Sequence, residues 1–170
     1  TIGIIGFGRI GQAEGRIAKA LGMNVLAYDL FPNDSGREIA EYVGLDELYA
    51  RADVITLHCN LTPENTGLIN KERIAKMKDG AILLNTARGA LVDEAAVTAA
   101  LRSGKLGFYG ADAFATEPLP ADSPLRKEPH ALLTPHIAWT TKEALQNLMD
   151  ITTRNLRTFL DGNGEHIVNR

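Results

Sequence analysis

Short apolar runs alternate with stretches of helical periodicity along the chain, and this alternation constrains the fold more than any other feature. A strand followed by a helix and a further strand favours a parallel sheet, covered by helices on both faces. Residues 31–36, 60–66 and 116–129 carry the Gly, Pro, Asn and Asp residues typical of loops. The expected strands are residues 2–6, 23–28, 40–43, 53–59, 80–85, 106–113 and 131–134, and the expected helices are residues 9–21, 46–51, 71–77, 93–103 and 141–160.

Capping residues mark several of these helix ends. Asn70 and Asp93 stand where a side-chain oxygen would accept from the first backbone N–H groups of a helix. Gly22 follows the expected helix 9–21, and Gly104 follows the helix that Asp93 would cap; glycine commonly ends a helix at such positions. The longest expected helix places most of its apolar residues on one stripe: Leu145, Leu148, Ile151, Leu156 and Phe159.

The composition is that of a globular domain and excludes several classes of protein. The chain has 170 residues, of which 45% are hydrophobic and 23% charged, so we expect one ordered domain. The net charge of −3 argues against a nucleic acid or an anionic membrane as partner. Cys59 is the single cysteine, which excludes an internal disulfide and a multi-cysteine metal site. The apolar runs are too short to span a bilayer, and no signal peptide precedes the first strand, so we expect a cytoplasmic protein.

The two ends of the chain predict a domain from a longer polypeptide. The sequence begins on a strand without an initiator Met and ends on an apolar, strand-like step at residues 167–170. We therefore expect residues 1–170 to be a single domain cut from a larger chain. The alternative is a short natural protein whose initiator Met has been removed.

Three glycines follow the first expected strand, and a helix begins among them. Gly6 would allow the tight turn, Gly8 the approach of a pyrophosphate to the helix N-terminus, and Gly11 close packing of helix on strand. This strand–turn–helix context predicts a dinucleotide site. The expected fold class is therefore α/β, a Rossmann-type doubly wound parallel sheet with helices on both faces.

An acidic residue completes the pattern at the end of the second expected strand. Asp29 lies 18 residues after Gly11, near the usual spacing of about 20. Its carboxylate can accept from both ribose hydroxyls and would repel a 2′-phosphate, which favours NAD over NADP as cofactor. The alternative interpretation is a generic tight turn beside an ordinary surface acid.

Polar residues follow the later strands, where parallel sheets bind their ligands. Oxidation of an alcohol needs a base, an acceptor for the hydride, and a cation for a carboxylate or a developing oxyanion. His136 fits the base, because an imidazole exchanges protons near neutral pH. Glu117 is the candidate carboxylate that orients this imidazole, and Arg88 offers a planar fork for a carboxylate and a carbonyl.

Each of these three residues also has a structural interpretation. Arg88 could decorate a turn beside Gly89, Glu117 could be an exposed loop acid, and His136 could be a hydrogen-bonded loop histidine.

The remaining candidates divide between packing and contact with a ligand. We interpret Phe7 as a packing residue, His58 as a structural residue at the sheet end, and Cys59 as a packing residue that faces the cofactor rather than a nucleophile. Asp112 fits a structural cap and a contact to a nicotinamide equally well. Trp139 fits either a core residue or a wall of the substrate pocket.

Together these runs resemble the NAD-binding domain of the D-isomer-specific 2-hydroxyacid dehydrogenases, over essentially all 170 residues. The resemblance rests on the glycine pattern and on residues 58–62, 65–70, 85–94, 110–114, 116–118 and 134–139. Its most specific parts are the Thr-Ala-Arg-Gly run at 86–89 and the Thr-Pro-His run at 134–136.

The resemblance implies a role for each matching residue. Arg88 would bind the substrate carboxylate and carbonyl, His136 would be the acid/base, and Glu117 would hydrogen-bond that histidine. The implied cofactor is NAD. Residues implied to contact it, besides the three glycines, are Arg9 and Ile10 at the pyrophosphate, Asp29 at the ribose, Cys59, Asn60, Thr86, Ala87 and Arg88 along its length, and Asp112 near the nicotinamide.

Two positions depart from the pattern of the family. Asn60 stands where the family usually has Pro, and Ala113 where it usually has Val, so the departures concern pocket detail more than the reaction. Residues 135–144 and 148–151 look most like the glycerate dehydrogenase or hydroxypyruvate reductase branch.

The resemblance also implies partners. A second, flavodoxin-like domain of the family has no counterpart here, so we expect residues 1–170 alone to bind NAD(H) but to turn over poorly. The expected substrate is a small 2-hydroxy or 2-keto acid, and a homodimer would form through this domain. The alternatives are a non-catalytic NAD-sensing or partner-binding module, and a dehydrogenase of another substrate class.

Overall fold

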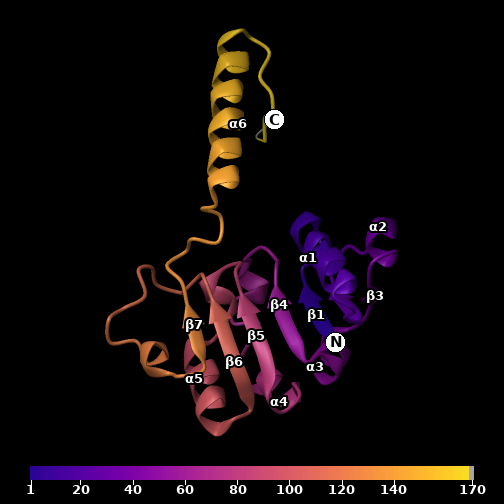
Figure 1. Ribbon diagram of the computed structural model, residues 1–170, viewed down its shortest axis with the longest axis vertical. Coiled ribbons are helices and arrows are strands. Elements are labelled where there is room, and N and C mark those ends of the chain that lie inside the picture. Colours follow the sequence, from indigo (N-terminus) through magenta and orange to yellow (C-terminus); the bar gives the residue numbers. More distant parts are fainter. Residues whose placement is uncertain (169–170) are drawn as a thin grey trace. The chain divides into compact units, whose positions relative to one another are not determined.

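The computed structural model describes residues 1–168 and divides into two compact units, Thr1–His136 and a second one that begins at Ile137. The first unit contains a seven-stranded sheet (Figure 1). Its strands are β1 (Ile2–Ile5), β2 (Val25–Tyr28), β3 (Glu41–Tyr42), β4 (Val54–Leu57), β5 (Ala81–Asn85), β6 (Leu106–Ala111) and β7 (Ala131–Leu133). All neighbours are parallel, and the order is β3-β2-β1-β4-β5-β6-β7.

The register of the sheet brings the carboxyl ends of neighbouring strands together. Ile5, the last residue of β1, pairs with Tyr28 of β2 and with Leu57 of β4. On the other side, Ala111 of β6 pairs with Asn85 of β5 and with the last residue of β7. The loops that follow these strands therefore leave the sheet at one edge, although they are far apart in sequence.

Helices of the first unit cover both faces of this sheet. Successive residues of β1 point to opposite faces, and Ile4 shares a core with Ala18, whereas Ile5 shares another with Leu48 and Val97. The first of these cores includes residues of the helix over 9–20, and the second includes residues of the helices over 45–51, 71–76 and 94–103. The helices are α1 (Arg9–Ala20), α2 (Asp34–Arg37), α3 (Leu45–Arg51), α4 (Lys71–Lys76), α5 (Glu94–Ser103) and, in the second unit, α6 (Lys142–Leu160), with short 3₁₀ turns η1 (Pro63–Asn65), η2 (Gly89–Leu91) and η3 (Pro124–Lys127). The predicted doubly wound α/β fold is confirmed.

The predicted caps act as expected. The Asn70 side chain accepts from Arg73 N at 3.0 Å, and Asp93 accepts from two backbone N–H groups of the first turn of α5. Gly104 ends α5 in the left-handed conformation, with φ of 75°. These contacts satisfy N–H groups that lack partners within their own helices.

One predicted loop was wrong, and several strand ends were too long. Residues 31–36 were predicted as loop, but α2 begins at Asp34, where Asn33 Oδ1 accepts from Gly36 N at 2.8 Å. A helix of four residues is too short to show apolar periodicity, so the sequence pattern missed it. The strands predicted over 53–59 and 106–113 end at Leu57 and Ala111, because the polar residues beyond them leave the sheet.

The second unit consists mainly of α6. Thr141 caps it by accepting from Ala144 N at 3.2 Å, and the predicted apolar stripe lies within it. Within residues 1–168, no helix combines the length and apolarity that a membrane crossing requires.

Candidate functional site

The glycine turn after β1 has no room for side chains at two of its three glycines. Gly6 has φ of +92°, and a Cβ there would lie 2.4 Å from Cys59 N. A Cβ on Gly11 would lie 2.2 Å from the carbonyl oxygen of Gly6. Both positions therefore require glycine, for the tight turn and for the close packing of α1 that the sequence predicts.

Gly8 is different, because a Cβ there would meet nothing within 4 Å. Gly8 is the N-cap of the twelve-residue α1, and its first turn contains no acidic residue. Arg9 and Ile10 follow on the exposed surface. The site thus presents an open space before the positive end of a helix, which fits the pyrophosphate of a dinucleotide.

Asp29 lies against this turn, as the sequence predicts. Its Oδ2 accepts from Phe7 N at 2.6 Å, and its Oδ1 accepts from Phe31 N at 2.9 Å. A carboxylate has about four acceptor positions, so two remain for hydroxyl groups. The half-buried carboxylate is therefore held beside the glycines in a state that can still bind a ribose.

The ends of β4 and β5 supply the next predicted cofactor residues. Cys59 is half-buried beneath Gly6, and burial raises the pKa of its thiol, which fits packing rather than nucleophilic chemistry. Asn60 and Thr86 are exposed, and the Asn60 carbonyl accepts from Asn65 Nδ2 at 2.7 Å.

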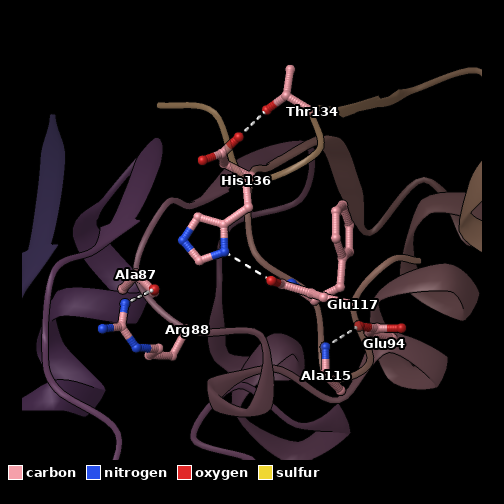
Figure 2. A network of polar contacts seen from close by, with 9 residues as sticks. Ala87, Arg88, Glu94, Ala115, Glu117, Thr134 and His136 are labelled. Atoms are coloured by element: carbon pink, nitrogen blue, oxygen red, sulfur yellow. Dashed lines mark hydrogen bonds and ion pairs between the residues drawn. The ribbon is translucent and has the colours of Figure 1, made fainter. Parts of the chain in front are cut away.

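A buried amide shapes the loop that carries Arg88. Asn85 is fully buried at the end of β5; its Nδ2 donates to Arg88 O at 3.0 Å and its Oδ1 accepts from Ala87 N at 3.1 Å. The Arg88 side chain is exposed, and its Nη1 donates to Ala87 O at 2.7 Å (Figure 2). Within residues 1–168, Arg88 takes part in no ion pair with a carboxylate. Its guanidinium therefore keeps donors available for an anion.

Glu117 and His136 form a hydrogen-bonded pair, drawn in Figure 2. His136 Nδ1 lies 2.8 Å from Glu117 Oε2, while Glu117 Oε1 accepts from Phe114 N at 3.0 Å. The histidine bond, and after it the Phe114 N–H, lower the pKa of Glu117, so this carboxylate is ionised near neutral pH. His136 has φ of 55°, a left-handed conformation that is uncommon outside glycine.

Asp112 follows β6 and Thr134 follows β7, and a hydrogen bond between their side chains links the two strand ends. Thr134 Oγ1 donates to Asp112 Oδ1 at 2.5 Å, and Asp112 is only 4% exposed. This bond supports the structural interpretation of Asp112. It also identifies Thr134 as a residue that the sequence reasoning missed, although it stands in the Thr-Pro-His run.

A cavity of about 560 Å³ lies beside the pair. Glu117 and His136 line it together with Phe114, Pro118, Leu119, Arg126, Leu133, Thr134 and Pro135. His136, the candidate acid/base, is thus accessible from a cavity with mostly apolar walls.

The structure also shows the surroundings of three further candidate residues. Phe7 is fully buried and contacts the Tyr42 ring edge to face, which confirms the packing interpretation. His58 Nε2 lies 3.0 Å from Thr56 Oγ1, and burial lowers the pKa of His58, in keeping with a structural role. Trp139 belongs to the second unit and is 51% exposed.

The sequence and the fold both match known proteins. The chain is 52% identical over 171 residues to a hydroxypyruvate reductase of Blautia hydrogenotrophica, covering 100% of this chain and 53% of that protein. It is 44% identical over 171 residues to a glycerate dehydrogenase of Methylorubrum extorquens, covering 99% and 52%. The crystal structure of a D-lactate dehydrogenase with NAD⁺ from Lactobacillus jensenii matches with a TM-score of 0.93 at 36% identity, covering 99% of this chain and 55% of that one.

The chain spans about half the length of the curated relatives it matches. Residues 1–138 match the family model described as "D-isomer specific 2-hydroxyacid dehydrogenase, NAD binding domain". This range contains the glycine turn, Asp29, Arg88, Glu117 and His136. The chain belongs to the family of NAD-binding domains of the D-isomer-specific 2-hydroxyacid dehydrogenases.

Proposed function

We propose that this chain is the NAD-binding part of a dehydrogenase that interconverts a small D-2-hydroxy acid and its 2-keto acid. The observation that carries the proposal is the 2.8 Å contact of Glu117 Oε2 with His136 Nδ1, at the sheet edge that also carries the Arg88 loop. A cofactor-binding module without chemistry needs the glycines and Asp29, but it has no use for an oriented acid/base pair. The names of the relatives support the same class of reaction.

His136 serves as the acid/base of the proposed reaction. During oxidation its imidazole takes the proton of the substrate hydroxyl, and during reduction it returns a proton to the carbonyl oxygen. Glu117 fixes the ring through Nδ1, so Nε2 is the atom that exchanges the proton. The ionised Glu117 also stabilises the imidazolium that forms.

Arg88 binds the substrate in this proposal. Its planar fork suits a carboxylate next to a carbonyl, where two parallel hydrogen bonds set the orientation. To do so, the guanidinium exchanges its bond to the Ala87 carbonyl for bonds to the substrate. The buried Asn85 keeps the backbone of the loop in place during this exchange.

The first half of the chain holds the cofactor. Gly8, Arg9, Ile10 and the N-terminus of α1 would bind the pyrophosphate, and Asp29 the ribose. The remaining contacts would come from Cys59, Asn60, Thr86, Ala87, Arg88 and Asp112. Bound NAD supplies the acceptor or donor of the hydride at C2 of the substrate.

The proposal also covers the substrate, the location and the association of the protein. The substrate is a glycerate- or hydroxypyruvate-like acid, in line with the two relatives named above. The protein is cytoplasmic, residues 1–170 act as one NAD-binding domain, and two copies associate through it.

Full-length protein with two substitutions tests the residue roles. His136→Ala should lower kcat/KM for hydroxypyruvate with NADH by about 10²–10⁴-fold, the range of general acid–base catalysis. Arg88→Ala should raise KM and lower kcat, because the lost bonds bind and orient the substrate. In His136→Ala the dissociation constant of NADH, measured by fluorescence titration, should stay unchanged, and in Arg88→Ala NADH should still bind.

Two matched variants and a substrate panel complete this experiment. His130→Ala and Arg16→Ala change exposed residues of the same types and should leave turnover unchanged. The panel contains D-glycerate, D-lactate and 3-phosphoglycerate with NAD. NADH binding without turnover of any panel member or of hydroxypyruvate would favour the sensing module and overturn the proposal.

A further inference from the structure

The turn that carries Glu117 is held by a second carboxylate from another part of the chain. Two successive backbone N–H groups of this turn each donate to a carboxylate. Phe114 N donates to Glu117 Oε1 at 3.0 Å. Ala115 N donates to Glu94 Oε1 at 2.9 Å, a bond drawn in Figure 2. Glu94 comes from the first turn of α5, 21 residues before Ala115. The contact is therefore tertiary and links helix α5 to the turn.

The same turn also rests on the backbone next to Arg88. A Cβ on Gly89 would lie 1.8 Å from the Phe114 carbonyl carbon and 2.2 Å from Ala115 N. Gly89 thus lets the peptide between Phe114 and Ala115 approach η2 directly. This one peptide group therefore lies against Gly89 and also donates to Glu94.

Glu117 needs such support because packing does little to hold it. Its side chain is 37% exposed, and it forms hydrogen bonds with Phe114 N and with His136. An exposed carboxylate on a loop samples several rotamers unless its backbone is held. The positive end of α5 also stabilises the negative charge of Glu94, which lies in its first turn.

We propose that Glu94 is a positioning residue of the site, which keeps the turn at 114–117 in the form that lets Glu117 reach His136. This inference rests on the proposed dehydrogenase function. Glu94 does not contact the substrate or the cofactor in it, and it acts only through Glu117.

If Glu94 acted only through its charge, its removal would shift the pKa of Glu117 in the opposite direction from release of the turn. The charged or titratable groups around Glu117 include Asp112, just after β6, His136, in the loop after β7, and Arg126 of η3, which lines the same cavity. Glu94 of α5 contacts the turn at Ala115. Removing the negative charge of Glu94 would by itself lower the pKa of Glu117. Releasing the turn would raise it toward the ordinary value, because Glu117 would lose part of its bonds to Phe114 N and His136.

The experiment compares Glu94→Ala with Glu94→Gln in the full-length protein. The amide oxygen of glutamine can still accept from Ala115 N, whereas alanine cannot. The Glu117 carboxyl is titrated by ¹³C NMR and assigned with Glu117→Gln. We expect its pKa to rise in Glu94→Ala and not in Glu94→Gln. An equal fall in both variants would overturn the inference.

Turnover provides the second measurement. We expect kcat/KM for hydroxypyruvate to fall about tenfold in Glu94→Ala, the effect of one hydrogen bond at a charged group, and to recover to within about twofold in Glu94→Gln. In the Glu117→Gln background, Glu94→Ala should not lower kcat/KM further, because Glu94 acts on turnover only by positioning Glu117. Additive losses, or equal losses in both Glu94 variants, would contradict the inference.

Matched variants separate this result from other failures. Glu72→Ala removes an exposed acid from the first turn of α4 and should change neither measurement. Thermal unfolding checks that each variant is folded, and Glu94→Gln carries the test if the alanine variant is not. If the unmodified protein reduces no 2-keto acid, the proposed function fails, while the titration still reports whether Glu94 holds the turn.

Discussion

The hydrogen bond between Thr134 and Asp112 should contribute measurably to stability and to the site. It joins the ends of β6 and β7 at 2.5 Å, two residues before His136. Thr134→Val keeps the shape of the side chain but removes the hydroxyl donor. Asp112 is 4% exposed, so water replaces the lost donor poorly.

The expected magnitude follows from this burial. A buried acceptor that loses its hydrogen-bond donor costs about 1–3 kcal/mol, and the near-isosteric valine leaves no cavity that would add to this. For a chain of this size, a loss of about 2 kcal/mol lowers Tm by roughly 4–8 °C. We also expect kcat/KM to fall, because the bond fixes the strand end that leads to His136.

Urea denaturation and thermal unfolding measure the first effect, and hydroxypyruvate reduction by the full-length protein measures the second. Thr66→Val is the matched control, since its hydroxyl donates to the Thr62 carbonyl on the surface. The control should cost less than about 0.5 kcal/mol. If Thr134→Val costs no more than Thr66→Val, the buried bond does not hold the strand ends and the reasoning is refuted.

Three other outcomes are expected. Burial raises the pKa of the Cys59 thiol, so at about pH 8 it should react with a disulfide reagent more slowly than a small free thiol; equal rates would contradict this. The pKa of Glu117 is lowered in the folded protein, so its stabilising effect is present above the ordinary carboxyl range and is lost as pH falls through the lowered value. The difference in unfolding free energy between the unmodified protein and Glu117→Gln should therefore shrink as pH falls from about 6 to about 3, and a difference that grew would show the wrong sign. Residues 1–170 alone should bind NADH in a fluorescence titration yet reduce hydroxypyruvate poorly, and native-like turnover would refute that expectation.

Local sequence signals predicted the parts of the fold that depend on a few neighbouring residues. Gly6 and Gly11 allowed the tight turn to be predicted, and the structure shows that the backbone there leaves no room for a Cβ. Asp93 and Gly104 marked both ends of α5 through their capping chemistry. These features arise within one or two turns of chain, so the sequence carries them directly.

Contacts between distant segments were less accessible to sequence reasoning. Asp112 and Thr134 each appear in a recognisable run, but their bond exists only because β6 and β7 are neighbours. Likewise, nothing in the sequence near Glu94 points to Ala115, which it reaches only in the folded chain. The left-handed φ of His136 also has no local sequence signal, since glycine is the usual residue in that conformation.

The free space at Gly8 means that this glycine is required for a different reason from Gly6 and Gly11. Gly6 and Gly11 face backbone atoms, so any larger residue there strains the chain in the absence of a ligand. Gly8 faces open solvent, so an alanine at this position would meet a clash only with the bound dinucleotide. A screen that scores variants by solubility or melting would thus tolerate change at position 8, whereas a screen that scores capture of the nucleotide would reject it.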